Sequence, residues 1–398
     1  MTATLKLKPY QRVVAATGLS NLADGVRFVA LPLLALDVTS SPFFLTAVVA
    51  ASMAPWLVFG LWAGSLTDRL DRRALAQRTA LLRVGLLSLL GVLVLLSAVP
   101  AVLLLGAAFV LGMSEVLADN VNGALIPSLV PEDELERANS RMVGAEILGN
   151  ELIGPAVGGL LFAAAASLPF FTNAGLLAVA FLLLSGLPLL QIPADAQPQT
   201  AQRRAFDGFA LILASPILRT LTWSSAVLAA IDGAWFALLA FLVVEELGLS
   251  YSIFGVFLAI GAFGGLVGAF IADKAPQLPL PKVSAVAFTL MSVPLIVLSA
   301  VPTATVVVVA LVMTSGAFSM WNIFMVSARQ RASTPQTLGT IGAAYRSVVV
   351  AAALAGTLAG GLLAELFSIQ VTLAAAAVAL CLTAPPVLWS FRNAASVD

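Results

Sequence analysis

The side chains that could do chemistry in this sequence are ionisable residues inside long apolar stretches. They are Asp24 and Arg27 in the first stretch, Glu115 and Asp119 in the fourth, and Asp232 in the seventh. A charged side chain within hydrocarbon is costly unless a partner or an aqueous cavity shelters it, and such residues relay protons or contact substrates. The pattern therefore predicts proton transfer or polar substrate contact inside a membrane.

Asp24 and Arg27 lie near the middle of the first stretch. Asp24 is about 11 residues from the basic end of that stretch, which corresponds to roughly 17 Å of helix. Arg27 follows one turn later, so both side chains share a helix face. Two interpretations are open: either the two residues form a structural ion pair, or Asp24 takes up and releases a proton while Arg27 stabilises its ionised form.

Glu115 and Asp119 are four residues apart and also share a helix face. Two carboxylates that close together in a poorly hydrated place cannot both be ionised at low cost, which is the property that a proton-coupled carrier needs. Alternatively, Asp119 is solvated at the membrane boundary and Glu115 alone is embedded. Asp232 is the candidate of the second half, either for substrate contact or proton coupling or for a hydrogen-bonded structural role.

The apolar stretches dominate the composition. Hydrophobic residues make up 60% of the 398 residues and charged residues 10%, whereas soluble domains have about 25% charged residues. Because about 20 apolar residues cross a bilayer as a helix, the sequence predicts an all-α polytopic membrane protein with twelve transmembrane helices in two six-helix pseudo-symmetric bundles. The expected spans are 13–36, 43–66, 74–98, 101–126, 142–166, 169–190, 217–243, 251–272, 283–300, 303–326, 341–364 and 370–391. The bundles are expected at residues 1–190 and 217–398, joined by a cytoplasmic linker at 191–216.

Several classes of function are disfavoured by what the sequence lacks. Lysine plus arginine and aspartate plus glutamate both number 20, so net charge gives no reason to expect nucleic acid as a partner. Histidine is absent, no lysine lies in a phosphate-binding loop, and the only cysteine, Cys381, lies in the last apolar stretch and is expected to be buried. We therefore expect no enzyme activity, no cofactor and no metal site.

Lysine and arginine occur at alternate ends of the expected spans. Basic residues precede span 1 and follow spans 2, 4, 6, 8, 10 and 12, whereas the intervening loops contain none. Positive charge is retained on the cytoplasmic side. Both termini are therefore expected to be cytoplasmic.

Glycines form a repeat with a period of three spans. Pairs four residues apart occur in spans 2, 5, 8 and 11, at Gly60/Gly64, Gly154/Gly158, Gly261/Gly265, Gly264/Gly268 and Gly356/Gly360. Because such pairs let helices approach closely, we expect these spans to form helix-to-helix contacts. Spans 1, 4 and 7, which contain the embedded charges, are expected to line an aqueous interior. Span 10 joins them by position and contributes Trp321 and Asn322.

Span 5 contains a further acidic residue and a proline. Glu151 precedes the sequence Gly154-Pro155-Ala-Val-Gly158-Gly159. Proline removes a backbone donor and loosens a helix locally, so a hinge and a packing role are both open. Glu151 either reaches the interior or pairs with an arginine such as Arg83.

A charge-rich loop follows span 2. Residues 64–73 read Gly-Ser-Leu-Thr-Asp-Arg-Leu-Asp-Arg-Arg. We interpret this loop as a conformational latch, in which Asp68 accepts hydrogen bonds from the start of a neighbouring helix and the arginines pair with acidic groups or anionic lipid. The expected latch residues are Gly64, Asp68, Arg69, Asp71, Arg72 and Arg73. The alternative is a positively charged membrane anchor without a gating role.

The loop resembles the one between spans 2 and 3 of major facilitator superfamily transporters, Gly-x-Leu-Ala-Asp-Arg-x-Gly-Arg-Lys, although Asp71 stands where that pattern has its second glycine. The Gly-Pro-x-x-Gly-Gly sequence of span 5 resembles the antiporter signature of this superfamily, without its two upstream glycines. Further segments look like the bacterial branch of enterobactin exporters and macrolide efflux pumps, among them Ser20–Asp24, Leu31–Leu34, Thr39–Pro42 and Pro127–Asn139.

The resemblance implies a proton-coupled antiporter that exports a drug or siderophore-like amphipathic molecule by alternating access in the bacterial inner membrane. Its expected partners are a small-molecule substrate, protons and the lipid bilayer, and we expect a monomer. An uncoupled facilitator or an importer is the alternative. A membrane-embedded binding protein that moves nothing is the third hypothesis.

Overall fold

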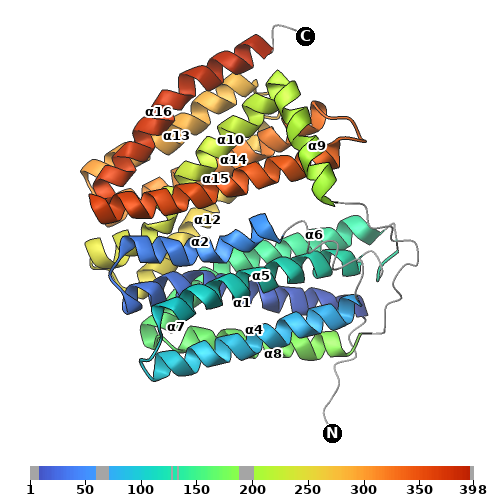
Figure 1. Cartoon of the computed structure of the whole chain (residues 1–398), viewed down its shortest axis with the longest axis vertical. Coiled ribbons are helices and arrows are strands. Elements are labelled where there is room, and N and C mark those ends of the chain that lie inside the picture. Colours follow the sequence, from blue (N-terminus) through green and yellow to red (C-terminus); the bar gives the residue numbers. More distant parts are fainter. Residues whose placement is uncertain (1–8, 60–70, 127–128, 132–133, 188–200, 395–398) are drawn as a thin grey trace. The chain divides into compact units, whose positions relative to one another are not determined.

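The computed structural model describes residues 9–59, 71–126, 129–131, 134–187 and 201–394. These residues fold into helices joined by short turns (Figure 1). In the first half the elements are α1 (Pro9–Val38), α2 (Pro42–Val58), α4 (Arg72–Leu95), α5 (Ala101–Leu125), α6 (Leu135–Glu146), the π-helical segment η3 (Ile147–Ile153), α7 (Gly154–Ala164) and α8 (Leu168–Ser185). In the second half they are α9 (Ala201–Ala214), α10 (Pro216–Ala237), α11 (Leu239–Phe241), the π-helical segment η4 (Leu242–Glu246), α12 (Tyr251–Lys274), α13 (Leu280–Ala300), α14 (Ala304–Arg331), α15 (Leu338–Leu366) and α16 (Ile369–Ala394).

The helices match the expected spans. Within the described residues, 11 helices are long and apolar enough to cross a membrane, and the shorter apolar helix α2 starts where the second span is expected. The rest of that span falls mostly outside the described residues. Continuous helices connect α6, η3 and α7, and likewise α10, α11 and η4. The prediction of an all-α polytopic protein is confirmed.

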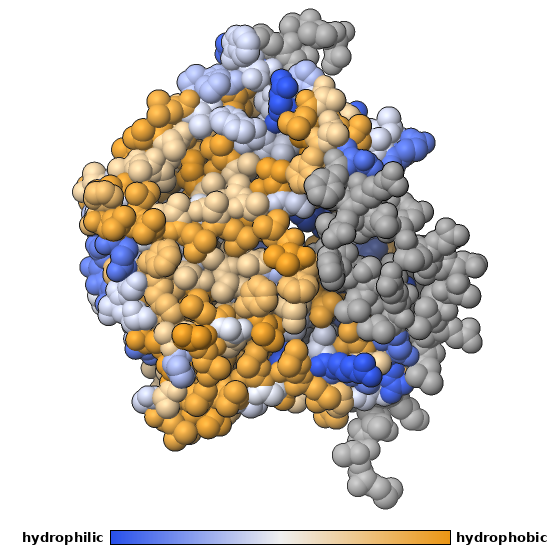
Figure 2. Space-filling view, in the orientation of Figure 1, coloured by the Kyte–Doolittle hydropathy of each residue, from blue (hydrophilic) through white to orange (hydrophobic). Residues whose placement is uncertain are grey.

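Hydrophobic side chains cover much of the described surface that is visible in Figure 2. Outward-facing examples are Leu182, Leu382 and Trp389, which are 67%, 71% and 67% exposed. In water such a surface would be unfavourable, whereas lipid tails are as apolar as these side chains. The surface therefore fits a protein whose helices contact a bilayer.

Contacts divide the chain into two compact units. Unit 1 contains Met1–Val38, Ala54–Gln199 and Tyr251–Val256, and unit 2 contains Thr39–Met53, Thr200–Ser250 and Phe257–Asp398. Helices α2 and α12 thus contribute residues to both units. The bundle and linker boundaries expected from the sequence remain a prediction.

In unit 1, glycines bring α1 and α7 together. A side chain on Gly154 would place its Cβ 2.6 Å from the Cα of Gly25, and one on Gly158 would place its Cβ 2.8 Å from the carbonyl oxygen of Val26. Both distances are shorter than a methyl group tolerates. The close helix contact that the sequence predicted for span 5 is confirmed, and its partner is α1.

Glycines have the same role in unit 2. A Cβ on Gly360 of α15 would lie 2.8 Å from the Cα of Ala234 on α10, and one on Gly264 of α12 would lie 2.7 Å from the Cα of Val312 on α14. Gly265 differs, because a Cβ there would meet its nearest neighbour only at 4.0 Å. The pair Gly60/Gly64 lies outside the described residues.

Two details differ from the expectations, namely the position of Arg137 and Arg141 and the exposure of Cys381. Arg137 and Arg141 lie inside α6, because this helix begins at Leu135, earlier than expected. Helix α9 lies within the stretch expected to be the linker, and it is separate from the span that follows it, since Ser215 has an extended backbone and caps α10. Cys381 is exposed rather than buried, because α16 packs through another face that includes the buried Leu380.

Candidate functional site

Helix α1 places Asp24 and Arg27 in the interior of unit 1. It is contacted by α5, α6, η3, α7 and α8, so its middle turns have little surface left for lipid. The Asp24 and Arg27 side chains are 4% and 5% exposed, and Arg27 Nη2 lies 3.3 Å from Asp24 Oδ1. The pair that the sequence suggested is present, and it is buried.

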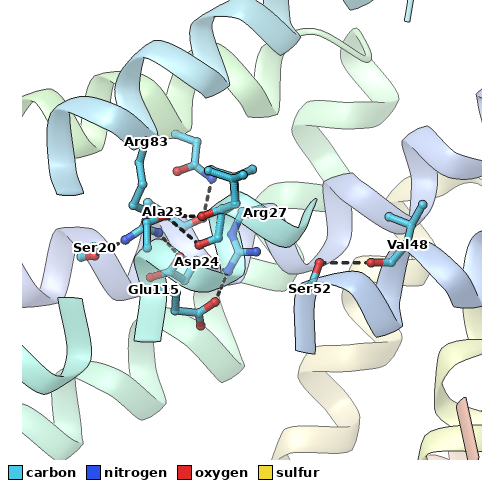
Figure 3. Close-up of polar contacts among 12 residues, drawn as sticks. Ser20, Ala23, Asp24, Arg27, Val48, Ser52, Arg83 and Glu115 are labelled. Carbon is cyan, nitrogen blue, oxygen red and sulfur yellow. Dashed lines mark hydrogen bonds and ion pairs between the residues drawn. The ribbon is translucent and has the colours of Figure 1, made fainter. Parts of the chain in front are cut away.

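A second arginine reaches the same carboxylate from α4. Arg83 Nη2 donates to Asp24 Oδ1, and Arg83 Nη1 donates to Ser20 Oγ over 3.1 Å. The Arg83 side chain is only 1% exposed. Figure 3 shows Arg83 and Arg27 approaching Asp24 from different helices. Asp24 therefore connects α1 to α4.

Glu115 of α5 completes the group by accepting a hydrogen bond from Arg27 Nη2 (Figure 3). We call Asp24, Arg27, Arg83 and Glu115 the ion-pair network. With both carboxylates ionised, two positive and two negative charges balance. Glu115 is the most exposed member, at 18%, so contact with the surroundings is greatest on α5.

The backbone around Asp24 is held by neighbouring elements. Asn173 Nδ2 of α8 donates to the carbonyl oxygen of Ala23 over 2.6 Å. On the other side, a Cβ at Gly25 would lie 2.7 Å from the carbonyl oxygen of Gly149 in η3. Only glycine allows this close approach, so the position of Asp24 is fixed by packing on both sides.

The π-helical segment η3 lies next to this point and ends where Gly154 and Pro155 begin α7. Pro155 has no backbone N–H to continue a regular helix, which fits the local widening. Gly154, Pro155, Gly158 and Gly159 are all buried. This burial fits a packing role, and both the packing role and the hinge role remain predictions.

Two predicted acidic residues lie outside the ion-pair network. Asp119, one turn beyond Glu115 on α5, is exposed, and so is Glu151 on η3. Glu115, in contrast, pairs with Arg27. Arg83 pairs with Asp24 rather than with Glu151. The acidic pair expected on α5 is thus divided between an ion pair and an exposed side chain.

In unit 2 the candidates belong to α10 and α14. Asp232 is half-buried and Asn322 is exposed. Trp321 is 1% exposed, and its Nε1 donates to Ser225 Oγ of α10 over 3.1 Å. Trp321 therefore joins α14 to α10, and its indole N–H is already used.

Half of the expected latch can be placed. Asp71 caps α4 by accepting from the backbone N–H of Ala74 over 2.8 Å, and Arg72 begins that helix. Arg73 donates to the carbonyl oxygens of Ser185 and Leu187 at the end of α8. Gly64, Asp68 and Arg69 lie outside the described residues. The placed residues fix the ends of two helices of unit 1.

Sequence reasoning missed the roles of Arg83 and Ser20. The available signal was that Arg83 is an ionisable residue well inside an apolar run, which calls for a partner. In the part of the chain that the structure describes, no group of three or more His, Cys, Asp or Glu residues is placed to hold a metal ion. The ion-pair network can therefore bind a charged group, transfer a proton or neutralise a charge.

The sequence matches the model of a known protein family. The sequence profile described as Major Facilitator Superfamily matches residues 13–357. No curated protein matches the sequence.

Several solved structures have a similar fold. A nucleoside transporter, NupG, has a TM-score of 0.80 at 12% identity, covering 97% of this chain and 99% of its own. A bacterial homologue of the iron transporter ferroportin, in an inward-facing state, has 0.77 at 18%, covering 98% and 99%. A bacterial homologue of the human lysosomal transporter Spinster, inward-facing and unoccupied, has 0.75 at 15%, covering 96% of each chain. At these identities the likeness concerns the fold.

Proposed function

The chain belongs to the Major Facilitator Superfamily, and we propose that it is a proton-coupled antiporter that exports an amphipathic small molecule by alternating access. Its fold is that of the transporters of this superfamily. Proton coupling, outward direction and the kind of substrate are the proposed parts.

The ion-pair network carries this proposal. It joins α1, α4 and α5 through buried contacts, and it is neutral only when both carboxylates are ionised. Adding a proton to either carboxylate leaves a guanidinium without its full counter-charge, which is unfavourable in a buried place. Proton uptake must therefore change the contacts among these helices, as coupling requires.

Asp24 is the proposed coupling residue because both arginines contact it. Loss of its charge releases α1 from α4 and weakens the hold on Arg27. Glu115 is the more exposed carboxylate and is the proposed point at which the network meets the substrate cavity. Asp232 and Asn322 are further proposed substrate contacts, because neither is fully buried.

The comparisons do not indicate the chemical class of the substrate. The similar structures are a nucleoside transporter, a homologue of an iron transporter and a homologue of a lysosomal transporter, so their names indicate no common substrate. An overexpressing strain screened for growth against diverse toxic compounds would identify candidates. The compound that gives the strongest protection would be used in the transport test.

The test uses that compound in proteoliposomes under an imposed pH gradient. We expect the gradient to drive uptake or release by the natural protein. Asp24→Asn should abolish the driven component while leaving binding of the compound. Asp273→Asn is the control, since Asp273 is 73% exposed beside Lys274. Normal gradient-driven transport by Asp24→Asn would show that the coupling assignment is wrong.

An uncoupled facilitator or importer is the second candidate, favoured by one observation. Each carboxylate of the network already has an arginine partner, so the network also suits a purely structural role. This candidate predicts counterflow at a rate that does not depend on the pH gradient. A binding protein that moves nothing would show neither driven transport nor counterflow.

A further inference from the structure

A small cavity lies beside the ion-pair network within unit 1. Its volume is about 20 Å³, and residues of α1, α4, α5 and α8 line it. Alanine and leucine side chains form most of its wall, and its polar lining residues are Ser20, Thr79, Arg83 and Asn122. The cavity therefore combines an apolar wall with a few convergent polar groups.

The cavity lies toward one end of the helices that surround it. Ser20 precedes Asp24 by one turn of α1, and Thr79 precedes Arg83 by one turn of α4. Asn122 follows Glu115 by two turns of α5, which runs the other way. This is the end at which α1 and α4 begin, and the distribution of positive charge predicts that it faces the cytoplasm.

The polar groups around the cavity have unused hydrogen-bonding capacity. Arg83 uses its two terminal nitrogens for Ser20 and Asp24, whereas its Nε is buried and has no partner among the described residues. Thr79 donates its hydroxyl hydrogen to backbone carbonyls of α4, so its oxygen can still accept. An unpaired buried donor costs about 1–3 kcal/mol, which favours an occupant that can satisfy it.

The size and lining select the occupant. By the same measure of volume, a water molecule needs roughly 10–15 Å³ and two to four polar partners, whereas cavities with purely apolar walls stay dry. A volume of about 20 Å³ is therefore enough for a water molecule. Four polar residues supply the partners.

We propose that this cavity is a hydration site. We further propose that its water is the innermost water on a proton route from the cytoplasmic end of unit 1 to Asp24. The route runs inside the bundle, between α1, α4, α5 and α8. Ser20 and Asp24 bind the two terminal nitrogens of the same guanidinium, so Arg83 links the hydroxyl to the carboxylate. A proton that reaches the water displaces one to Ser20, which passes its own to Asp24; the carboxylate becomes neutral, and water and serine end unchanged.

The hydration site stands without the proposed function, whereas the proton route rests on it. Water is therefore the first probe, by X-ray hydroxyl-radical labelling of the full-length protein in nanodiscs, in which a bound water labels the side chains beside it. Leu177 and Leu184 line the cavity and are 1% and 5% exposed. Leu104 and Leu111 are also buried, at 0% exposed, but do not line it.

We expect Leu177 and Leu184 to be labelled several-fold faster than Leu104 and Leu111. Asn122→Leu keeps a similar volume and removes a polar partner of the water, so it should reduce the difference. Asn120→Leu is the matched control, because the Asn120 amide binds the carbonyl oxygen of Val116 on the same helix. Equal labelling of all four leucines would overturn the hydration site.

Transport then tests the proton route. Asn122→Leu should slow gradient-driven transport several-fold relative to Asn120→Leu, while counterflow without a gradient stays the same in both variants. Equal driven rates in the two variants would overturn the route. If transport by the natural protein does not depend on the pH gradient, both the proposed function and the proton route are wrong. The labelling result still decides whether the hydration site exists.

Discussion

Arg83 of α4 donates a hydrogen bond to the carboxylate of Asp24 on α1, although 59 residues separate the two in the sequence. Asp24 also contacts Arg27 on its own helix. One buried carboxylate thus holds a local partner and a distant one. The distant contact gives Asp24 a connection between helices, which a pair within α1 alone would not provide.

Removing Arg83 should destabilise the protein strongly. Breaking a buried ion pair by deleting one partner costs about 3–5 kcal/mol, because the remaining charge is left uncompensated. We expect Arg83→Ala to lower the unfolding temperature in detergent by several degrees. Lys274→Ala is the control, since its pair with Asp273 is 65% exposed at the lysine and exposed pairs contribute little.

A double variant separates charge from packing at the same place. Asp24→Leu combined with Arg83→Leu removes both charges and keeps apolar volume, and such replacements are often neutral or stabilising. We expect the double variant to be more stable than Arg83→Ala. An equally unstable double variant would mean that shape, not charge, sets the stability of this site.

Glu115 and Asp119 should respond differently to neutralisation, although they are one turn apart. Glu115 accepts a hydrogen bond from Arg27, whereas Asp119 is exposed. We expect Glu115→Gln to lower both the unfolding temperature and the rate of gradient-driven transport, because Arg27 loses a counter-charge. Asp119→Asn should leave stability unchanged. Equal effects of the two substitutions would contradict the division of roles on α5.

Two glycines of unit 1 provide a matched test of helix packing. A Cβ on Gly154 would lie 2.6 Å from Gly25 Cα, whereas Gly175 on α8 has no atom within 4 Å of that position. Gly154→Ala should destabilise the protein by about 1–3 kcal/mol through overpacking. Gly175→Ala should stabilise it slightly, because alanine favours a helix by about 1 kcal/mol over glycine. Thermal unfolding of both variants gives the comparison.

Hydropathy alone placed the helices well, because each span must satisfy its backbone groups internally and must be apolar over its length. The small residues at Gly154 and Gly360 also identified the helices that pack closely. The choice of partner was beyond the sequence: nothing in span 5 indicates that α1, rather than another helix, lies against Gly154. Helix contacts depend on the tertiary arrangement, which local patterns do not encode.

The candidate site was predicted in part. Asp24, Arg27 and Glu115 were recognisable because a charge in an apolar run needs a partner. The connection between Glu115 and Arg27 spans 88 residues, so spacing along one helix could not reveal it. Trp321 was expected to line a cavity, but its indole is buried and bound to Ser225. An aromatic residue in a span has the same appearance in the sequence whether it packs or binds.

Asp71 allows the capping and gating roles of the latch to be separated. Its side chain accepts from the backbone N–H of Ala74 at the start of α4, and replacing a capping residue by alanine costs about 0.5–2 kcal/mol. Asp71→Ala should therefore lower the unfolding temperature, whereas Asp71→Asn, which caps equally well without a charge, should not. If the role is capping alone, Asp71→Asn will also transport at the normal rate. Slower transport by a fully stable Asp71→Asn would instead show that the charge itself acts during the conformational cycle.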